Sequence, residues 1–583
     1  MSEMSFFKDI ENLYSVIVQP IENIYKNTAI HSFRSKYKLK DNELIRDFYI
    51  LNIEKKNGVV YTTEEISNYL VKSTIKKIDI INNPYMKIVD PSCGCGNIIF
   101  SIFNHLIHVY EDNLEEINKK HNLKLSIDNL KNHIVKNNLY AIDIDKLALE
   151  ILVIDFFYRN NIIFLNIENK DFLIDKTKEK FNVFIGNPPY IGHKDIEKEY
   201  FNNIKKVYGE IYKNKSDLSY CFFKASFDKG NVNCKVTFIT SRYFLESESG
   251  KNLRKYISNK FYIDRIIDFY GIRPFKNVGI DPCIIFLTKK DRNNVYKNYK
   301  VEIIKPRRGE YKKEQFIKNV TNHKEIKCEN FLKGKEEFEK DRWLLINENE
   351  LNILKKIESK CNVSLKEICN SHQGIISGCD KAFIVNSEDI KNEELEKTII
   401  KPWIKSSHIK KNGIENKDMF LIYSNEIEDE KKFPNIINHL YKYVDKLENR
   451  RECRKGIRKW YELQWGRKKE IFQGKKIIFP YKSKENIFTL DKGNYFSADV
   501  YCMFIKDNIN YDYEFLISVL NSKIYQFYFQ CFGKKLGENL YEYYPNTVME
   551  MKIPKYFKKE FLEEELYEYF NLNEEEKEII KKV

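Results

Sequence analysis

The sequence predicts an α/β protein in which a doubly wound, mostly parallel sheet is followed by a mixed α+β module. Strands and helices alternate from residue 58 to about residue 300, which indicates a sheet covered by helices on both faces. Met86–Asp90 has the composition of a short buried strand, and a glycine-rich turn joins it to a helix over residues 97–110. Residues 181–186 form a second apolar, strand-like run, which stops at Asn187-Pro188-Pro189-Tyr190.

Length and composition divide the chain into three parts. The 583 residues suggest three to four domain-sized units. Residues 1–57 are expected to form amphipathic helices, because apolar side chains recur there near helical spacing: Phe6, Phe7, Ile10, Leu13, Tyr14, Ile17 and Val18. A polar, lysine-rich passage near residues 289–340 marks a boundary, which gives a catalytic domain over 58–330 and a second domain over 331–583. In that second domain, a short strand over 500–505 and a helix around 515–531 predict mixed α+β structure.

The turn after the first strand reads Asp90-Pro91-Ser-Cys93-Gly94-Cys95-Gly96. Glycines at this place let the backbone approach a ligand closely, and the following helix presents its N-terminal amides. The spacing Asp-Pro-x-x-Gly-x-Gly differs from both the phosphate-binding loop and the dinucleotide fingerprint. An acid at the strand end suits an ammonium group better than a phosphate, so Asp90 is a candidate for binding a cationic ligand.

Two further predicted strands carry acids at their ends. Leu139-Tyr-Ala-Ile leads into Asp143-Ile144-Asp145, and another segment leads to Asp171-Phe172. A carboxylate at the end of the second strand of a doubly wound sheet usually binds a ribose hydroxyl, so Asp143 is the candidate. The glycine turn lies much further upstream than the usual ~20 residues, because a charged helical stretch over 111–138 intervenes. Each acid taken alone is also compatible with a helix cap or a turn.

The Asn187-Pro188-Pro189-Tyr190 segment predicts a pocket for a planar group that bears an amine. Two adjacent prolines hold the strand tip rigid, so the Asn187 amide oxygen and the Pro188 carbonyl can accept hydrogen bonds from an NH2 group. The Tyr190 ring can stack on the plane of the same group. The alternative is a plain strand stop with an exposed tyrosine.

The charge distribution is compatible with a nucleic-acid partner. The formal net charge is +14, and 39 Tyr and 40 Phe supply stacking surfaces. Abundant lysine also reflects A/T-rich coding DNA, so the local pattern carries more weight. Between residues 450 and 476, eleven basic residues outnumber three acids and are interleaved with Trp460, Tyr461 and Trp465.

The sequence gives little support for a membrane protein, a secreted protein, a metalloprotein or a cytosine-C5 methyltransferase. No stretch approaches the ~20 apolar residues of a membrane span, and the N-terminus lacks the pattern of a signal peptide. The 12 cysteines contain no Cys-x-x-Cys pair, so we expect reduced thiols in a cytosolic protein and no metal site. Pro282-Cys283 mimics the nucleophile dipeptide of cytosine-C5 methyltransferases, but it opens an apolar strand, which favours core packing.

Taken together, these segments resemble the type IIG-like amino-methyltransferases that use S-adenosylmethionine, in which the cofactor half precedes the catalytic half and a target-recognition domain follows. Gly58-Val-Val-Tyr61-Thr62-Thr63 is similar to the family's leading cofactor motif, with Thr63 in place of the usual Pro. Residues 236–245 resemble its next strand, with Ser241 where Pro is usual, and Phe275-Lys-Asn277 matches the position of a second aromatic at the target base. From about residue 58 to about 555 the chain resembles solitary clostridial DNA adenine methyltransferases associated with sporulation, through segments that include residues 93–96, 187–194, 242–247, 373–383 and 449–467.

The resemblance implies a Rossmann-like methyltransferase domain, a mixed α+β target-recognition domain and a set of site residues. The implied catalytic residues are Asn187, Pro188, Pro189 and Tyr190, with Tyr190 and Phe275 stacking on the target base. The implied cofactor residues are Tyr61, Thr62, Asp90, Pro91, Cys93, Gly94, Gly96, Asp143, Ile144, Asp171, Phe172 and Asn187. The expected DNA contacts are His193, Lys194, Arg242, Arg450, Arg451, Arg454, Arg458, Lys459, Trp460, Tyr461, Trp465 and Arg467.

The expected function is transfer of a methyl group from S-adenosyl-L-methionine to adenine N6 of a base flipped out of double-stranded DNA. The resemblance implies a short asymmetric site, CAAAAA, methylated at its last adenine, and a monomeric cytoplasmic enzyme associated with the nucleoid. A fused endonuclease is not expected, because few residues precede Gly58. Three alternatives stay open: a protein glutamine methyltransferase, a DNA cytosine-N4 methyltransferase, and a catalytically idle DNA-binding regulator.

Overall fold

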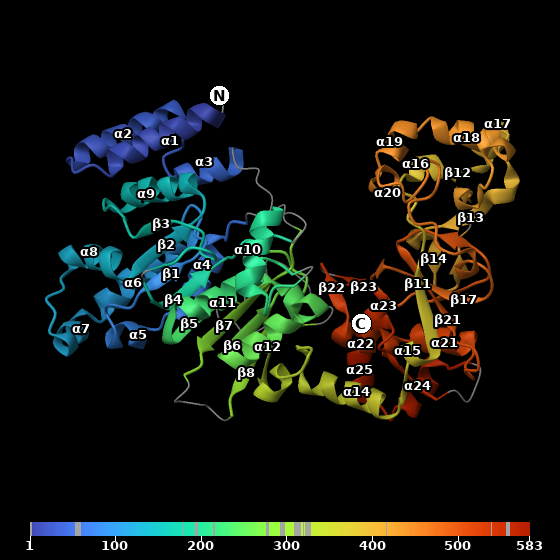
Figure 1. Ribbon diagram of the computed structural model, residues 1–583. Helices are drawn as coiled ribbons and strands as arrows, with labels where there is room; N and C mark the ends of the chain where they lie inside the picture. The colour runs from blue at the N-terminus through green and yellow to red at the C-terminus, as the bar shows by residue number, and fades with distance from the viewer. Residues whose placement is uncertain are drawn as a thin grey trace. The chain divides into compact units, whose positions relative to one another are not determined.

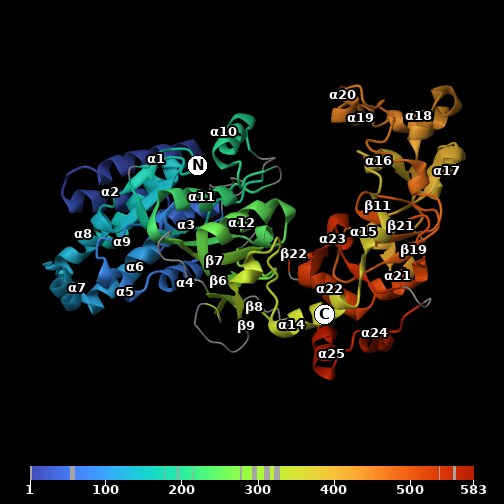
Figure 2. The ribbon, with the colours of Figure 1, turned by 60° about the horizontal axis from the view of Figure 1, so that its bottom comes forward.

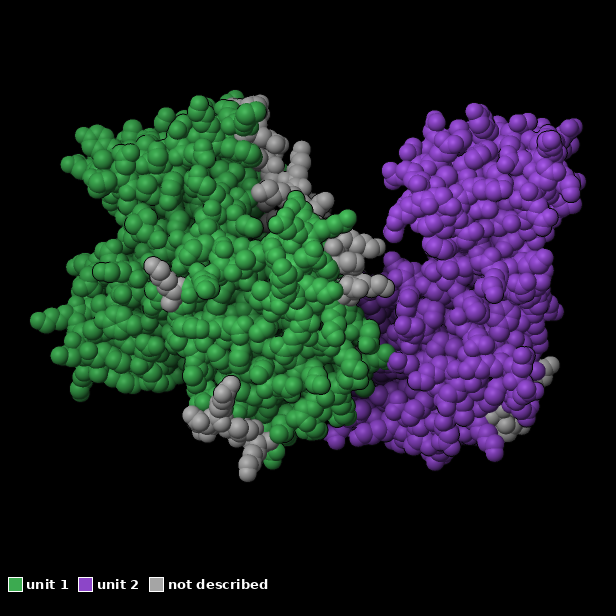
Figure 3. All heavy atoms as spheres, in the orientation of Figure 1, with its two compact units in different colours: residues 1–345 green, residues 346–583 purple. Residues whose placement is uncertain are grey.

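The chain forms two compact units in a computed structural model, residues 1–345 and residues 346–583 (Figures 1 and 3). The structure describes residues 3–52, 60–177, 179–192, 196–213, 216–275, 279–291, 298–307, 316–318, 320, 328–415, 417–537, 539–555 and 560–583. The predicted boundary at residue 330 falls inside the strand Cys328–Gly334, which pairs with a strand of the first unit over its whole length. That pairing explains why the first unit extends beyond residue 330.

The first unit is built on a nine-stranded sheet in the order β3-β2-β1-β4-β5-β7-β6-β8-β9. The strands β3, β2, β1, β4 and β5 are parallel, and β7 runs antiparallel between β5 and β6. This mostly parallel sheet confirms the predicted fold class. Its strands are β1 (Ile88–Asp90), β2 (Leu139–Asp143), β3 (Ile167–Asn169), β4 (Phe181–Gly186), β5 (Gly230–Ser241), β6 (Phe261–Asp268), β7 (Pro282–Lys289), β8 (Lys300–Pro306) and β9 (Cys328–Gly334).

Helices cover both faces of this sheet, as expected for a doubly wound fold (Figures 1 and 2). One face packs mainly on α4 (Glu64–Thr74), α5 (Lys77–Asn82), α6 (Asn97–Asp112), α7 (Leu114–His121) and α8 (Ile127–Asn137). The other packs on α10 (Lys198–Tyr208), α11 (Ser219–Lys229) and α12 (Lys251–Lys260). The long interval before Asp143 is therefore filled by α7 and α8, which extend the helical layer without changing the sheet.

Three N-terminal helices pack against α9 (Lys146–Asn160): α1 (Glu3–Ile17), α2 (Asn23–Lys36) and α3 (Ile45–Asn52). Of the apolar residues predicted for α1, Phe6, Ile10, Leu13 and Ile17 are buried in a shared cluster with α9, whereas Phe7 is exposed. Asp155 of α9 fixes the start of α3, since its carboxylate accepts hydrogen bonds from the amides of Ile45 (3.0 Å) and Arg46 (2.9 Å). Burial raises the pKa of Asp155 to about 6.

The second unit mixes small sheets with short helices. Its largest sheets have the orders β11-β21-β17-β19 and β12-β16-β13-β20. The strands are β10 (Val363–Ser364), β11 (Cys369–Gln373), β12 (Ile384–Val385), β13 (Ile400–Ile404), β14 (Ile409–Lys410), β15 (Gly413–Ile414), β16 (Phe420–Ile422), β17 (Lys476–Pro480), β18 (Lys482–Ser483), β19 (Thr489–Asp491), β20 (Tyr495–Phe496), β21 (Val500–Ile505), β22 (Lys534–Leu536), β23 (Leu540–Glu542) and β24 (Lys552–Ile553).

The helices of the second unit are α14 (Glu348–Ser359), α15 (Leu365–Ile368), α16 (Asp380–Phe383), α17 (Ser387–Asn392), α18 (Pro434–Tyr441), α19 (Val444–Glu448), α20 (Arg451–Arg454), α21 (Tyr513–Leu520), α22 (Lys523–Phe532), α23 (Pro545–Val548), α24 (Glu563–Tyr569) and α25 (Glu574–Lys581). The strand predicted over 500–505 is β21. The helix predicted around 515–531 is two helices, because Ser522 has an extended backbone and its side chain accepts a hydrogen bond from the amide of Tyr525, which starts α22.

Gly96 has little room for a side chain and a backbone conformation that favours glycine. It has a φ of +84° at the start of α6, and a Cβ there would lie 2.2 Å from Cδ1 of Leu152 in α9. We expect Gly96→Ala to lower the free energy of unfolding through both backbone strain and this steric clash. Gly474 is the matched control, because its φ is +78° and a Cβ would meet no atom within 4 Å.

Urea unfolding, followed separately for each unit by hydrogen exchange, measures both variants. The clash should make Gly96→Ala about 1–3 kcal/mol more destabilising than Gly474→Ala. An equal decrease in the free energy of unfolding for the two variants would show that the structure accommodates a side chain beside Leu152 without cost.

Candidate active site

Two strand ends meet where the strand order of the sheet reverses. Strand β1 ends at Asp90 and its neighbour β4 ends at Gly186, directly before Asn187. A Cβ on Gly186 would lie 2.9 Å from Asp90 Oδ1 and 3.0 Å from Pro91 Cδ, so the approach of the two ends requires glycine. Ligands of open α/β sheets bind at such switch points, outside the carboxyl ends of the strands.

Asp90 is a buried carboxylate beside an open cavity. It is 1% exposed, and its Oδ1 accepts a hydrogen bond from the amide of Ser92 (3.1 Å). Burial, together with the nearby charge of Asp143, raises its pKa well above the ordinary value. A cation bound at this carboxylate would relieve the cost of burying its charge.

Asp143 binds the glycine turn from the end of the neighbouring strand. Its Oδ2 accepts a hydrogen bond from the backbone amide of Gly94 (2.7 Å), and its Oδ1 accepts one from the backbone amide of Asp145 (2.8 Å). Burial raises the pKa of Asp143 as well. Asp145 instead caps α9, because its Oδ1 accepts from the amides of Leu147 (3.0 Å) and Ala148 (3.3 Å).

Asp171 and Phe172 follow β3 and line the same cavity. The carboxylate of Asp171 accepts hydrogen bonds from the hydroxyl of Tyr200 (2.7 Å) and the amide of Leu173 (2.8 Å). The ring of Phe172 stacks on that of Phe222 with 5.5 Å between centroids. These contacts give this end of the cavity an aromatic wall.

Residues 60–62 also line the cavity and are held by α6. The side-chain amide of Asn97 donates to the carbonyl of Thr62 (2.8 Å), and its Oδ1 is buried without a hydrogen-bond partner. Asn97 is also one of the residues that line the cavity. Sequence reasoning did not single out Asn97, and its position as the first residue of α6 after Gly96 was the available signal.

Both positions at which proline is usual adopt the backbone that proline would impose. Thr63 has a φ of −66° before α4, and Ser241 has a φ of −60° after β5. The hydroxyl of Ser241 also accepts a hydrogen bond from the amide of Tyr243 (3.4 Å). The two turns are therefore formed without the ring of proline.

The amide of Asn187 is fixed at both ends of its side chain. Its Nδ2 donates to the carbonyl of Val60 (2.7 Å), and its Oδ1 accepts from the hydroxyl of Tyr190 (2.5 Å). The hydroxyl of Ser92 donates to the backbone carbonyl of Asn187 (3.2 Å), which links the glycine turn to this residue. Tyr190 is 8% exposed, and burial raises the pKa of its hydroxyl well above the ordinary value.

A cavity of about 480 Å³ brings most of these residues together. Of the residues expected at the cofactor, it is lined by Tyr61, Thr62, Asp90, Pro91, Cys93, Gly94, Asp143, Ile144, Asp171, Phe172 and Asn187. Gly96 lies just outside it, at the start of α6. Pro188 and Pro189 also line the cavity, whereas Tyr190 and Phe275 do not.

Phe275, expected to stack on the target base, is buried in the core of the first unit. It is 5% exposed and belongs to a cluster with Phe269, Ile272 and Phe316. Asn277, His193 and Lys194 lie outside the described residues. The surroundings that would complete a base pocket next to Phe275 therefore include residues that the structure does not describe.

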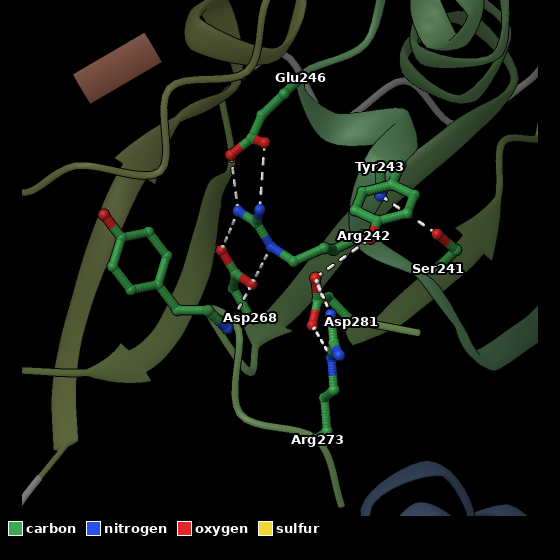
Figure 4. A network of polar contacts seen from close by, with 8 residues as sticks. Ser241, Arg242, Tyr243, Glu246, Asp268, Arg273 and Asp281 are labelled. Carbon is green, nitrogen blue, oxygen red and sulfur yellow. Dashed lines mark hydrogen bonds and ion pairs between the residues drawn. The ribbon is translucent and has the colours of Figure 1, made fainter. Parts of the chain in front are cut away.

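Arg242 is buried in a network of ion pairs rather than exposed as a phosphate contact (Figure 4). Its guanidinium donates to both carboxylate oxygens of Asp268 (2.8 and 2.9 Å) and of Glu246 (3.1 and 2.7 Å). Burial alone would lower its pKa, but the two carboxylates raise it well above the ordinary value. With these partners, Arg242 fixes the loop that leaves β5.

The basic segment over residues 450–467 contains both structural and exposed side chains. Arg450 donates to four backbone carbonyls and Tyr461 is 1% exposed, so both stabilise the second unit. Arg467 donates to the carbonyl of Gly374 and to Gln373 Oε1. Arg458 and Trp460 are partly buried, whereas the exposed members of the predicted set are Arg451, Arg454, Lys459 and Trp465.

Three further observations concern cofactors and compartments. All twelve cysteines are free thiols. Within the described ranges, no group of His, Cys, Asp and Glu side chains has the arrangement of a metal site. No described helix is both long and apolar enough to cross a membrane.

Two family models match separate parts of the chain. Residues 137–275 match the Eco57I restriction-modification methylase, and residues 401–553 match the TaqI-like C-terminal specificity domain. The first match covers the region that supplies Asp143, Asp171 and Asn187. The second lies entirely in the second unit.

Relatives and a solved structure extend over most of the chain. The Type II methyltransferase M.BstVI of Geobacillus stearothermophilus is 23% identical over 523 residues, which cover 85% of this chain and 90% of the relative. M.BanIII of Aneurinibacillus aneurinilyticus is 24% identical over 561 residues, which cover 86% and 90%. The Type IIL restriction-modification enzyme MmeI, solved in complex with DNA, has a similar fold, with a TM-score of 0.59 at 15% identity over 84% of this chain and 67% of that structure.

The residues at the strand ends provide what a sulfonium donor with an ammonium group and a ribose requires: a buried carboxylate at Asp90, a second one at Asp143 and an aromatic wall at Phe172. S-adenosyl-L-methionine is accordingly the expected cofactor. The chain is thus similar over most of its length to Type II methyltransferases, with a match to a restriction-modification methylase in the first unit and a match to a TaqI-like specificity domain in the second.

Proposed function

We propose that the protein methylates adenine N6 in double-stranded DNA and acts without a nuclease. The observation that carries this proposal is the side-chain amide of Asn187, which projects from the tip of β4 beside Asp90 and is oriented by the carbonyl of Val60. With Nδ2 occupied in this way, Oδ1 is the end of the amide that can accept a hydrogen bond from an exocyclic amine. The sequence resemblance further supports a short A-rich asymmetric site such as CAAAAA, and a monomer associated with the nucleoid.

Catalysis needs the target amine to be positioned and its lone pair to be released. Adenine N6 is a poor nucleophile because its lone pair is delocalised into the ring. Hydrogen bonds from N6–H to Asn187 Oδ1 and to the Pro188 carbonyl would withdraw that lone pair from conjugation. The bound cofactor supplies an electrophilic methyl group on a sulfonium, so positioning and electrostatics suffice without a covalent intermediate.

The cofactor side of the site is assigned to acids at the strand ends. Asp90 would pair with the methionine ammonium, and Asp143 with the ribose hydroxyls, while its remaining hydrogen bonds keep the glycine turn in place. The ring of Phe172 provides an apolar face for the adenine of the cofactor, beside the carboxylate of Asp171.

In the described arrangement, Tyr190 occupies the acceptor that the target amine requires. Its hydroxyl donates to Asn187 Oδ1, so capture of the base must replace this hydrogen bond. The replacement exchanges one hydrogen bond for another and costs little in itself. The hydroxyl of Tyr190 also donates to the carbonyl of Ile239 (3.3 Å), so it keeps a partner after the exchange.

The function is tested by digesting methylated DNA to nucleosides and identifying the product by mass. We expect N6-methyl-2′-deoxyadenosine from the purified protein with S-adenosyl-L-methionine and duplex DNA containing CAAAAA. Asn187→Ala should lower turnover by about 10²–10³-fold, the cost of losing one preorganised acceptor, with little change in cofactor affinity. N4-methyl-2′-deoxycytidine as product, or DNA binding without any methyl transfer, would contradict the proposal.

Tyr190 variants separate stacking from the hydrogen bond to Asn187. Tyr190→Phe keeps the ring and frees Asn187 Oδ1, so we expect unchanged or tighter binding of a duplex whose target adenine is unpaired. Tyr190→Ala should weaken that binding by ~1–3 kcal/mol through loss of the stacking partner. Titration of fluorescent duplexes measures both variants, and equal weakening by Phe and Ala would show that the hydroxyl, rather than the ring, holds the base.

Cofactor affinity should depend on pH through Asp90. Its pKa is raised by burial in the protein without cofactor, and only the carboxylate form pairs with an ammonium. Affinity should therefore rise with pH through that raised pKa and fall below it as the carboxyl group becomes protonated. Asp90→Asn should bind more weakly above this pKa by ~1.5–3 kcal/mol and lose the pH dependence, as calorimetry over a series of pH values would show. An identical pH profile for the two proteins would exclude Asp90 as the ammonium partner.

A further inference from the structure

The turn that ends α20 presents an isolated apolar side chain to solvent. Helix α20 (Arg451–Arg454) is closed by Gly456, with a φ of +69°, whose amide donates to the carbonyl of Cys453 (2.8 Å). The next amide, that of Ile457, donates to the carbonyl of Glu452 (2.9 Å). These two bonds form a Schellman motif, which fixes the position of Ile457.

Ile457 lacks the packing partner that this motif usually provides. The residue after the glycine of a Schellman motif commonly packs on an apolar residue in the last turn of the helix. Here that position is Glu452, which is buried and accepts a hydrogen bond from Gln464 Nε2 (2.9 Å). Ile457 is consequently 56% exposed at the tip of the turn.

Both ends of the segment that carries Ile457 are anchored by one side chain. The guanidinium of Arg450 donates to the carbonyls of Leu447 (2.9 Å) and Ser377 (3.1 Å), and on the far side of the tip to those of Trp460 (2.7 Å) and Glu462 (2.8 Å). Burial lowers the pKa of Arg450, whose guanidinium donates four hydrogen bonds to carbonyl oxygens. The tip is therefore preorganised on a rigid base.

Exposed cations surround the apolar tip. Arg451, Arg454 and Lys455 precede Ile457 and Lys459 follows it, all with exposed side chains. Among the described residues, Arg451, Arg454 and Lys455 have no ion-pair partner. Both ribbon views place α20 beside α19, at the end of the second unit opposite α24 and α25 (Figures 1 and 2). Tip and cations form one surface, Arg451 to Lys459, which we call the α20 tip.

We propose that the α20 tip binds duplex DNA, with Ile457 entering the base stack as an apolar wedge and the flanking cations meeting phosphates. The inference deepens the proposed function, since it takes DNA as the ligand. An apolar residue between cations on a rigid support is the combination that wedge-inserting proteins use to unstack a base step. The tip also lies inside the segment that matches a specificity domain, residues 401–553, which favours DNA over an anionic lipid surface.

The test uses a set of duplexes with 2-aminopurine at successive positions in and around the methylated site. This probe gains fluorescence where the stack opens, so wild-type protein should raise the signal at the target and at a second step. Ile457→Ala should abolish the rise at the second step and weaken binding about tenfold, whereas Ile457→Leu should retain both. Leu562, 71% exposed before the acidic start of α24, is the matched control, and Leu562→Ala should leave both quantities unchanged.

A cation variant separates the two parts of the surface. Arg454→Ala should reduce the salt dependence of DNA binding by about one unit, while the fluorescence rise at the second step remains. Wild-type fluorescence at the target alone, or an unaltered pattern with Ile457→Ala, would overturn the wedge even if methylation proceeds normally. If the wild type binds phosphatidylserine vesicles and Ile457→Ala does not, while both bind DNA equally, the α20 tip binds a lipid surface instead. Absence of methyl transfer by the wild type would contradict the proposed function. Methyl transfer is measured by nucleoside analysis, which does not depend on the 2-aminopurine fluorescence.

Discussion

The geometry of the site depends on the close approach of two strand ends. The neighbouring parallel strands β1 and β4 end close together at Asp90 and Gly186, and there is no room for a side chain at residue 186. Ser92 then bridges the two ends, since its amide donates to Asp90 and its hydroxyl donates to the carbonyl of Asn187. The acid that we assign to the cofactor and the amide that we assign to the target base are thus carried by one rigid pair of strands, which is the requirement for catalysis by positioning.

The polar groups of the site are largely satisfied within the protein itself. Asn187 is bonded at both ends of its amide, and Asp143 accepts two backbone amides. Internal partners avoid the cost of leaving buried polar groups unpaired when no substrate is bound. Because a substrate then exchanges hydrogen bonds instead of adding them, most of the free-energy cost of base capture lies in opening the DNA stack. A second element that contacts the base stack, as we propose for the α20 tip, would lower the free-energy cost of opening the stack.

Local sequence patterns predicted the sheet, the glycine turn and the acids at the strand ends, because these follow from residue order and strand direction. They also located the buried face of α1, and the family resemblance implied Phe172, which lines the cavity. They could not distinguish a cation that meets DNA from one that stabilises the fold. Arg242 and Asp268 are 26 residues apart, and Arg450 reaches a carbonyl 73 residues away, so their burial is decided by tertiary contacts that spacing does not reveal. The role of Gly186 was equally hidden, since its need for glycine arises from Asp90 on another strand.

The attachment of α3 to α9 has a consequence for synthesis on the ribosome. Asp155 binds the amide of Ile45 across 110 residues, and α1 buries its apolar face against the same helix. At ~5–20 residues per second, the first three helices would emerge ~5–20 s before their partner is made. During that interval Phe6, Ile10, Leu13 and Ile17 have no α9 to cover them. The nascent chain therefore presents an early apolar segment of the kind that ribosome-associated chaperones bind.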